Sequence, residues 1–481
     1  MKRENIGKPF QVLLADAKAF LTKYPVLIWV MILVALASFG FEMANFSLTF
    51  DEEIELARAY QEPFSNIQVH LENSRFLLAG IRSIFTVNGT FVPYIMTFMA
   101  VVWLFASAFL WAILIEKHFT KVSQLSLIAF TTIYMTVPFI IAELMIFAIS
   151  CDITFFGNFL ITFALYLIYE KPKKQKTWHY FLAALTTFVS FSIYQTNVGV
   201  FVIGFFALLL LWALNENEAT MQVKALCKYS KPYVLIGIVG IVSYLLVTKI
   251  LAMIFAVQGS YTTNMITWVN EGFSQGIRNI FGSIYRVISP KGNYGSKLVF
   301  LTLILLILFV IIYFFRHLNK KGVIIGFISA FFTLSVFTLP IVLGFSAPYR
   351  VLLTVLPFMG ISWFLFLHYS KKVKWVYVVS VLLVMYVLSQ QVLLLNTHFY
   401  SSHVMSQTDQ WNTKQIARDI LQKNNGLAPE IPIIFVGNHE EQVPQAQLVG
   451  GIGGSMINWQ GTQRRIYDLM YLQGFDFKVD Y

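Results

Sequence analysis

Long apolar stretches separated by short polar ones dominate the chain between residues 25 and 395. A helix needs roughly 20 mostly apolar residues to cross the ~30 Å hydrocarbon core of a membrane. About eleven stretches approach that length, so the pattern predicts an all-α, polytopic membrane protein. The expected transmembrane helices are 25–41, 91–115, 125–139, 154–169, 180–192, 197–214, 232–256, 298–315, 323–343, 351–368 and 375–395.

The polar segments divide the chain into three parts. Residues 1–24 form a polar arm, residues 25–395 form the membrane module, and residues 396–481 form a tail long enough for a small domain. Within the membrane module, the two longest polar segments are the loops 42–90 and 257–297.

The arm and the tail have patterns of their own. Residues 11–24 mix charged and apolar positions, which is typical of an amphipathic helix on a membrane surface. In the tail, helical spacing at 407–423 and 462–472 and a short apolar β run at 431–436 predict a small α/β domain. The glycine-rich segment 450–455 predicts a turn, because it lacks the strand, helix and lysine of a phosphate-binding loop.

Composition and charge agree with a membrane location. Hydrophobic residues make up 57% of the chain and charged residues only 12%, about half of what soluble domains carry. If the N-terminus is cytoplasmic, the cytoplasmic segments hold 20 Lys and Arg and the outer segments before the tail hold 8. This bias predicts a cytoplasmic N-terminus and, with eleven spans, an extracytoplasmic C-terminus. The net charge of +11 therefore reflects topology and does not indicate a nucleic-acid partner.

Three acidic residues, Asp51, Glu52 and Glu53, follow soon after the first expected span. Carboxylates so near hydrocarbon are costly unless they are hydrated or paired. One interpretation is a solvated helix N-terminus, where acids complement the helix dipole. The other is a carboxylate at the membrane surface that serves as a general base or metal ligand for a lipid-linked substrate.

Basic residues occur on the same predicted outer face. Arg75 and Arg82 lie two helical turns apart, which suits either clamping a phosphate or anchoring in lipid headgroups. Lys249 lies inside the seventh expected span, where it either reaches the outer surface or holds an anionic group in the bundle. Further polar candidates on this face are Arg278, Arg286, Arg350 and the pair Tyr194-Gln195.

Taken together, these features resemble membrane glycosyltransferases of the GT-C class, and in finer detail the O-antigen glucosyltransferase II (Gtr-type) family. The likeness spans nearly the full chain in short motifs. They are the acidic pair Asp51-Glu52, Ser74-Arg75-Phe76 in place of Gly-Arg-Trp, Tyr194-Gln195, 347–350 (Ala-Pro-Tyr-Arg), and 455–459 (Ser-Met-Ile-Asn-Trp) with Arg464-Arg465. Glu52 stands where the family often has a second Asp, so the chain departs from the family's pattern at this position and at Ser74-Arg75-Phe76.

The resemblance implies transfer of a sugar, glucose by family, from a polyprenyl-phosphate donor to a cell-surface glycan on the outer face of the cell membrane. Asp51 is then the expected general base, and Glu52 orients it or the acceptor. Arg75, Lys249 and Arg350 are expected to bind the donor phosphate, and Arg82, Tyr194, Gln195, Arg278 and Arg286 to contact substrate.

The resemblance also implies a donor synthase and a flippase as partners. The resemblance implies no certain cofactor, and Asp51 and Glu52 could hold a divalent metal, Mg²⁺ or Mn²⁺. Two alternatives remain open, a flippase or transporter of lipid-linked oligosaccharides, and a polysaccharide polymerase or membrane acyltransferase. A transporter predicts internal repeats and charges near the bilayer midplane, whereas the ionisable residues here gather on one face.

Overall fold

The computed structural model describes most of the chain. The described residues are 8–49, 51–62, 65–86, 92, 94–119, 121–170, 176–217, 221–255, 265–289, 296–436, 455–458 and 462–477. Within them the chain is helical and has no β-strand, so the all-helical polytopic class is confirmed.

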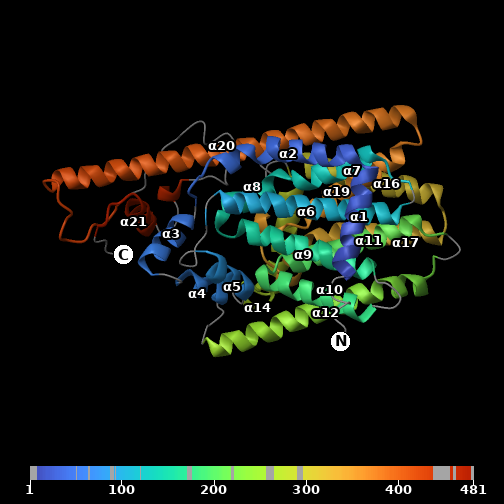
Figure 1. The fold of residues 1–481 in the computed structure, drawn as a ribbon, viewed down its shortest axis with the longest axis horizontal. Helices are drawn as coiled ribbons and strands as arrows, with labels where there is room; N and C mark the ends of the chain where they lie inside the picture. The colour runs from blue at the N-terminus through green and yellow to red at the C-terminus, as the bar shows by residue number, and fades with distance from the viewer. Residues whose placement is uncertain are drawn as a thin grey trace.

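A bundle of helices lying side by side forms the body of the molecule (Figure 1). Its members are α2 (Pro25–Ala44), α6 (Ile95–His118), α7 (Gln124–Met135), α8 (Pro138–Ile146), α9 (Cys151–Tyr169), α10 (Lys176–Ile193), α11 (Asn197–Asn215), α12 (Val223–Ile254), α16 (Leu298–Arg316), α17 (Lys320–Leu334), η4 (Ser335–Phe337), α18 (Thr338–Leu343), α19 (Val355–Ser370) and α20 (Lys374–Lys423).

Every one of the eleven expected spans coincides with helix. Among the described residues, eight spans are long and apolar enough to cross a membrane, or nine if the bent pair α7–α8 is counted as one. α10 does not meet these criteria and α19 is a shorter apolar helix. A count of eleven is therefore not confirmed.

Proline explains the largest irregularity inside the bundle. α7 ends at Met135 and α8 begins at Pro138, with a 43° bend between them. A proline lacks the N–H that would continue the helix and disfavours helical backbone in the residue before it, Val137. The expected single span at 125–139 is thus the first half of a broken helix.

Burial separates a core from a periphery. In the most apolar 18-residue stretch of each helix, 83% of the residues are buried inside the protein in α9 and 72% in α11, but only 22% in α12. α19 is also buried along nearly its whole length. The exposed residues of the outer helices are themselves apolar, for example Leu246 and Met253 of α12. A water-facing bundle would not expose such faces, so these helices face lipid.

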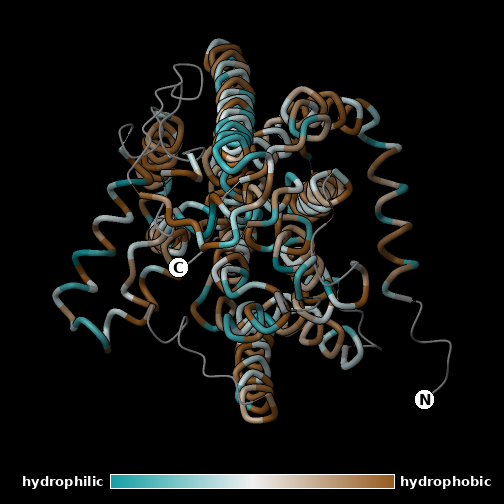
Figure 2. The backbone as a smooth tube through the Cα atoms, turned by 90° about the vertical axis from the view of Figure 1, so that its left-hand side faces the viewer, coloured by the Kyte–Doolittle hydropathy of each residue, from teal (hydrophilic) through white to brown (hydrophobic). Residues whose placement is uncertain are grey.

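The N-terminal helix α1 (Lys8–Lys23) lies across the long axis of the bundle (Figure 1). Figure 2 shows the molecule from the left-hand side of Figure 1, and there the helix next to the N-terminus carries both hydrophilic and hydrophobic residues. α1 includes most of the segment 11–24, and its expected place on the inner membrane surface stays a prediction.

A smaller group of helices covers one end of the bundle. We call it the cap and define it as α3 (Glu52–Gln61), residues 406–423 of α20, η7 (Met456–Asn458) and α21 (Thr462–Leu472). Ala417, Ile457, Ile466 and Met470 form a hydrophobic core inside it. α4 (Ser65–Glu72) and α5 (Phe76–Phe85) connect α3 to the bundle.

The tail differs in part from its prediction. The two expected helices form, the second over the same residues as α21, but the first is the end of α20, which runs for 50 residues from the bundle into the cap. No Gly or Pro occurs between Lys374 and Lys423, so nothing in the sequence breaks the helix at 395. Residues 431–436 form no strand and carry only an isolated β-bridge at Ile433, so an α/β domain is not confirmed. The glycine-rich segment lies outside the described residues except for Ser455.

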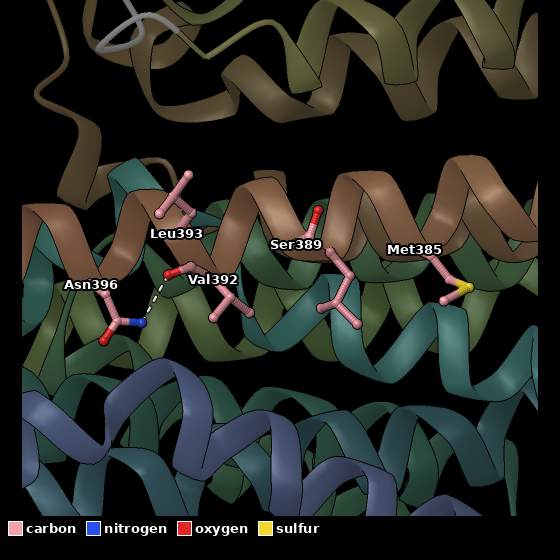
Figure 3. A pocket seen from close by; sticks show the side chains of 6 residues that line it. Met385, Ser389, Val392, Leu393 and Asn396 are labelled. Atoms are coloured by element: carbon pink, nitrogen blue, oxygen red, sulfur yellow. Dashed lines mark hydrogen bonds between the residues drawn. The ribbon is translucent and has the colours of Figure 1, made fainter.

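A shallow apolar hollow of about 550 Å³ lies on the bundle part of α20. Figure 3 shows its side chains along one stretch of the helix, with Asn396 bonded to the carbonyl of Val392. Asn396 also donates to the carbonyl of Ala37 in α2. The lining has no ionisable side chain, so the hollow suits a hydrocarbon chain and not a reaction centre. It is lined by Met385, Leu388, Ser389, Val392, Leu393 and Asn396.

Candidate functional site

The three consecutive acids start α3 and divide into one exposed and two buried side chains. Asp51 is the N-cap of α3 in a left-handed conformation (φ 71°), which Asp tolerates better than most residues. Its side chain is 56% exposed, whereas Glu52 and Glu53 are fully buried. Glu52 accepts a hydrogen bond from the backbone N–H of Thr49 at 2.9 Å. The carboxylate of Glu52 therefore fixes the turn that presents Asp51.

Arg465 of α21 joins the tail to this acidic turn. Its Nη2 donates to Asp51 Oδ1 at 2.8 Å, and its Nη1 donates to Glu53 Oε1. The guanidinium fork matches two carboxylates at once. Arg465 is only 7% exposed, so the contact closes the interface between α3 and α21. Burial raises the pKa of Glu53, and the adjacent Arg465 guanidinium opposes that rise.

Burial also shifts the pKa values of other titratable groups in this region. Burial raises the pKa of Glu55 to about 8, against the opposing charge of Arg82. Burial raises the pKa of Asp468, in α21, to about 6 although Arg464 lies 3.5 Å away. Burial and nearby arginines lower the pKa of His70 to about 3, so this imidazole stays neutral near pH 7.

Arg75 stacks on Tyr194, which brings together two of the predicted motifs. The guanidinium carbon lies 4.6 Å from the centre of the Tyr194 ring. The neighbouring Gln195 donates to the carbonyl of Asn73 at 2.7 Å and to the hydroxyl of Tyr244. Tyr194-Gln195 thus holds the turn that begins α5. Within the described part of the chain Arg75 forms no ion pair, and its buried Nε has no hydrogen-bond partner.

Arg82 serves a different purpose from Arg75. It is almost completely buried, and its Nη2 donates to Asp152 Oδ1 at 3.0 Å and to the carbonyl of Ile149 at 2.6 Å. Arg82 is therefore buried in an ion pair, whereas Arg75 forms no ion pair among the described residues. Arg82 ties α5 to the start of α9, where Asp152 neutralises it.

Arg350 pairs with Glu143 across the bundle. It belongs to η5 (Tyr349–Val351), and its Nη1 lies 2.8 Å from Glu143 Oε1 of α8. The backbone N–H of Arg350 donates to the other carboxylate oxygen at 3.1 Å. Its guanidinium also lies over the ring of Phe147, 4.7 Å from the centre.

Two contacts place the Asp51 turn beside the Glu143–Arg350 pair. The hydroxyl of Thr49, two residues before Asp51, donates to the carbonyl of Ile146. The next residue, Phe147, is the ring on which Arg350 lies. An exposed carboxylate and a partly exposed guanidinium therefore border the same region, where the cap meets the bundle.

The remaining predicted cations are placed differently. Lys249 is exposed near the end of α12, and Arg278 is exposed on α15 (Phe273–Ile288). Neither forms an ion pair with a described residue. Arg286 donates to Ser346 Oγ at 2.7 Å and to the carbonyl of Ala347 at 3.0 Å, so it holds the loop that leads to Arg350.

A metal ion at Asp51 and Glu52 would compete with the hydrogen bonds that these carboxylates already accept. Glu52 faces the Thr49 amide and Asp51 faces Arg465, so an ion would have to displace a guanidinium. In the residues that the structure describes, no three His, Cys, Asp or Glu side chains lie together as a metal site.

Two residues that form ion pairs in this region, Asp152 and Arg465, were not assigned a role from the sequence. Asp152 follows Cys151 at the start of an apolar stretch, and a lone acid there is a signal that an intramembrane partner exists. Arg465 lies in a short polar helix far along the chain from Asp51, and nothing local indicates that the two meet.

The sequence model of the family described as Glucosyl transferase GtrII matches residues 40–388. This range contains Asp51, Arg75, Glu143 and Arg350, and it ends inside α20 before Arg465. The predicted family resemblance is thereby confirmed. No match is found among curated proteins or among solved structures.

Proposed function

Because the chain belongs to the Glucosyl transferase GtrII family, we propose that it transfers glucose from a polyprenyl-phosphate donor to a cell-surface glycan. The reaction takes place where the cap meets the bundle. The observation that carries this proposal is the exposed Asp51 carboxylate beside the Glu143–Arg350 pair.

In the proposed orientation the N-terminus is cytoplasmic, and the cap lies outside the cell membrane. The eleven helical stretches would then all cross, with α19 as a buried member of a GT-C-like bundle and α10 as a partly buried one. The described basic residues at the end opposite the cap include Lys117, Lys321 and Lys371, as the distribution of positive charge requires. A donor synthase and a flippase would supply the donor to the outer leaflet.

Asp51 is the general base in this mechanism. Of the three consecutive acids it alone is exposed, so it alone can reach an acceptor hydroxyl. The hydroxyl oxygen attacks the anomeric carbon of the donor while its proton passes to the Asp51 carboxylate. Glu52 positions the turn through the Thr49 amide, and Arg465 orients the carboxylate from the other side.

Arginine side chains stabilise the leaving phosphate. As the bond between the anomeric carbon and the phosphate oxygen breaks, negative charge grows on the polyprenyl phosphate, and fixed cations lower the energy of that state. Arg75 suits this role because it forms no ion pair among the described residues and is held in place by Tyr194. Arg350 adds a second guanidinium, and the exposed Lys249 would contact phosphate at the headgroup level. Direct displacement predicts inversion at the anomeric carbon.

The test is transfer of labelled glucose in liposomes that contain the purified protein, polyprenyl-phosphate glucose and the host glycan. We expect a labelled product whose anomeric configuration is opposite to that of the donor. Retention of configuration would exclude direct displacement. Transbilayer movement of a labelled lipid-linked oligosaccharide without any glycosyl transfer would instead identify a flippase.

A further inference from the structure

Helix α15 (Phe273–Ile288) directs its polar face toward the protein and its apolar face outward, the reverse of a surface helix on a water-soluble protein. Asn279, Ser283 and Arg286 recur at spacings of four and three, which places them on one face. The opposite face is mainly apolar and aromatic, with the exposed Ser274 within it and the exposed Arg278 at its edge. Phe273, Phe281 and Tyr285 there are each at least 64% exposed, as is Val269 in the preceding helix α14 (Thr267–Asn270).

The polar face of α15 is bonded to the protein. Asn279 donates to the carbonyl of Gly344 at 3.0 Å, and Ser283 accepts from the backbone N–H of Ala347 at 3.3 Å. Arg286 donates to Ser346 and to the carbonyl of Ala347. These three polar side chains thus dock the helix onto the loop after α18.

Trp268 fixes the same arrangement from α14. Its indole N–H donates to the carbonyl of Ile341 at 3.0 Å. The ring lies against Gly276 and Gly344, where a Cβ atom would come within 3 Å of it. Gly344 also has a positive φ of 69°. This close fit means that the apolar face of α15 is directed outward by specific contacts.

The position of the helix matches the edge of the hydrocarbon layer. α15 lies between the end of α12 and the start of α16, and Figure 1 places α14 at the same end of the bundle as α4 and α5. α15 packs against α16 and α18. Both carry exposed apolar side chains, such as Phe300 in α16 and Val342 in α18, so the apolar face of α15 continues the lipid-facing surface of the bundle.

We propose that α15 lies in the plane of the membrane, with Phe273, Phe281 and Tyr285 among the acyl chains of one leaflet. The partner of this surface is the lipid bilayer. At 16 residues the helix is about 24 Å long, too short to span, and its amphipathic pattern is that of an interfacial helix. Arg278, exposed beside Tyr285 on the helix, would reach the phosphates of the headgroups.

Spin labels can test this directly. A background without Cys151 and Cys227, the two native cysteines, receives Phe281→Cys or Tyr285→Cys, and the labelled protein is placed in lipid nanodiscs. Leu246→Cys on α12 is the lipid-facing control, and Lys423→Cys in the cap is the water-facing control. Collision with molecular oxygen, which concentrates in hydrocarbon, is compared with collision with a water-soluble nickel chelate.

We expect labels at 281 and 285 to favour oxygen over nickel as strongly as the label at 246. A nickel preference like that at 423 would overturn the proposal. Protection from both reagents together with spin–spin broadening would also overturn it, because the face would then be covered by a second copy of the chain. Phe273→Cys provides a third position if either label disturbs folding, judged by a monodisperse elution profile.

Discussion

Two arginine–carboxylate pairs lie where the cap meets the bundle, and they are exposed in opposite senses. In the Asp51–Arg465 pair, the carboxylate is 56% exposed and the arginine 7%. In the Glu143–Arg350 pair, the carboxylate is 9% exposed and the arginine 33%. The first pair therefore offers a carboxylate to a ligand, and the second offers a guanidinium.

This difference teaches what each pair can do. A general base must reach the proton that it removes, which Asp51 can do and the buried acids cannot. A cation that stabilises a leaving phosphate must reach that phosphate, and Arg350 is 33% exposed whereas Arg82 and Arg465 are buried. In each pair the buried partner positions the exposed one.

The largest effect is expected from Asp51→Asn. An asparagine can still accept from Arg465 but cannot take up a proton, so the transfer rate should fall about 10³-fold. Asp419→Asn, an exposed cap residue on α20, should transfer glucose at the wild-type rate. A transfer rate for Asp51→Asn within tenfold of wild type would remove Asp51 from the role of base.

Removing the exposed guanidinium of the second pair should act on the donor. We expect Arg350→Gln to lower kcat/KM for the donor about 100-fold, but it also leaves Glu143 buried without its arginine, which is destabilising. The double variant Glu143→Gln/Arg350→Gln removes both charges and restores stability. If this folded double variant keeps the wild-type kcat/KM, Arg350 does not bind the donor phosphate.

A smaller effect is expected at the interface between α3 and α21. Arg465→Gln should raise amide hydrogen exchange in α21 about tenfold, because it leaves Glu53 buried without its guanidinium. Glu53→Gln in the same chain should recover part of the protection. Additive effects of the two substitutions would show that the contact does not hold the cap together.

The smallest effect concerns pH. Glu55 has a pKa of about 8 in the folded cap, raised by burial above its ordinary value of 4.5. The folded state therefore binds the proton more tightly than the unfolded state. The stabilisation that protonated Glu55 gives to the folded state is complete below its ordinary pKa of 4.5 and is lost as the pH rises through the folded-state pKa of about 8.

Between pH 7 and pH 8, opening of α3 should increase about fivefold through this group. Hydrogen exchange of α3, corrected for the intrinsic effect of pH on exchange, measures that opening. Glu55→Gln should show a flatter pH dependence than wild type. An unchanged slope in this variant would assign the titration to another group, such as Glu53.

Periodicity predicted the bundle because each span carries its own signal. All eleven apolar stretches are helical, and 462–472 forms the expected helix. The break at Pro138 and the uninterrupted helix from Lys374 to Lys423 depend on single residues inside or between those stretches, and a hydropathy pattern does not resolve them.

The candidate site was predictable only residue by residue. Asp51, Arg75, Tyr194-Gln195 and Arg350 were identified as candidates, but their neighbours were not. Whether an arginine forms an ion pair with a carboxylate, as Arg82 does with Asp152, depends on which helices pack together. The same holds for Arg465, whose contact with Asp51 exists only once the tail has folded onto α3.

The most direct test separates donor binding from transfer in the same preparation. Binding of labelled polyprenyl-phosphate glucose and glucose transfer are measured for wild type, Asp51→Asn and Glu143→Gln/Arg350→Gln. We predict that Asp51→Asn binds the donor within about twofold of wild type and transfers glucose about 10³-fold more slowly, while the double variant loses donor binding. Loss of donor binding in Asp51→Asn, or unchanged binding in the double variant, would contradict this division of roles.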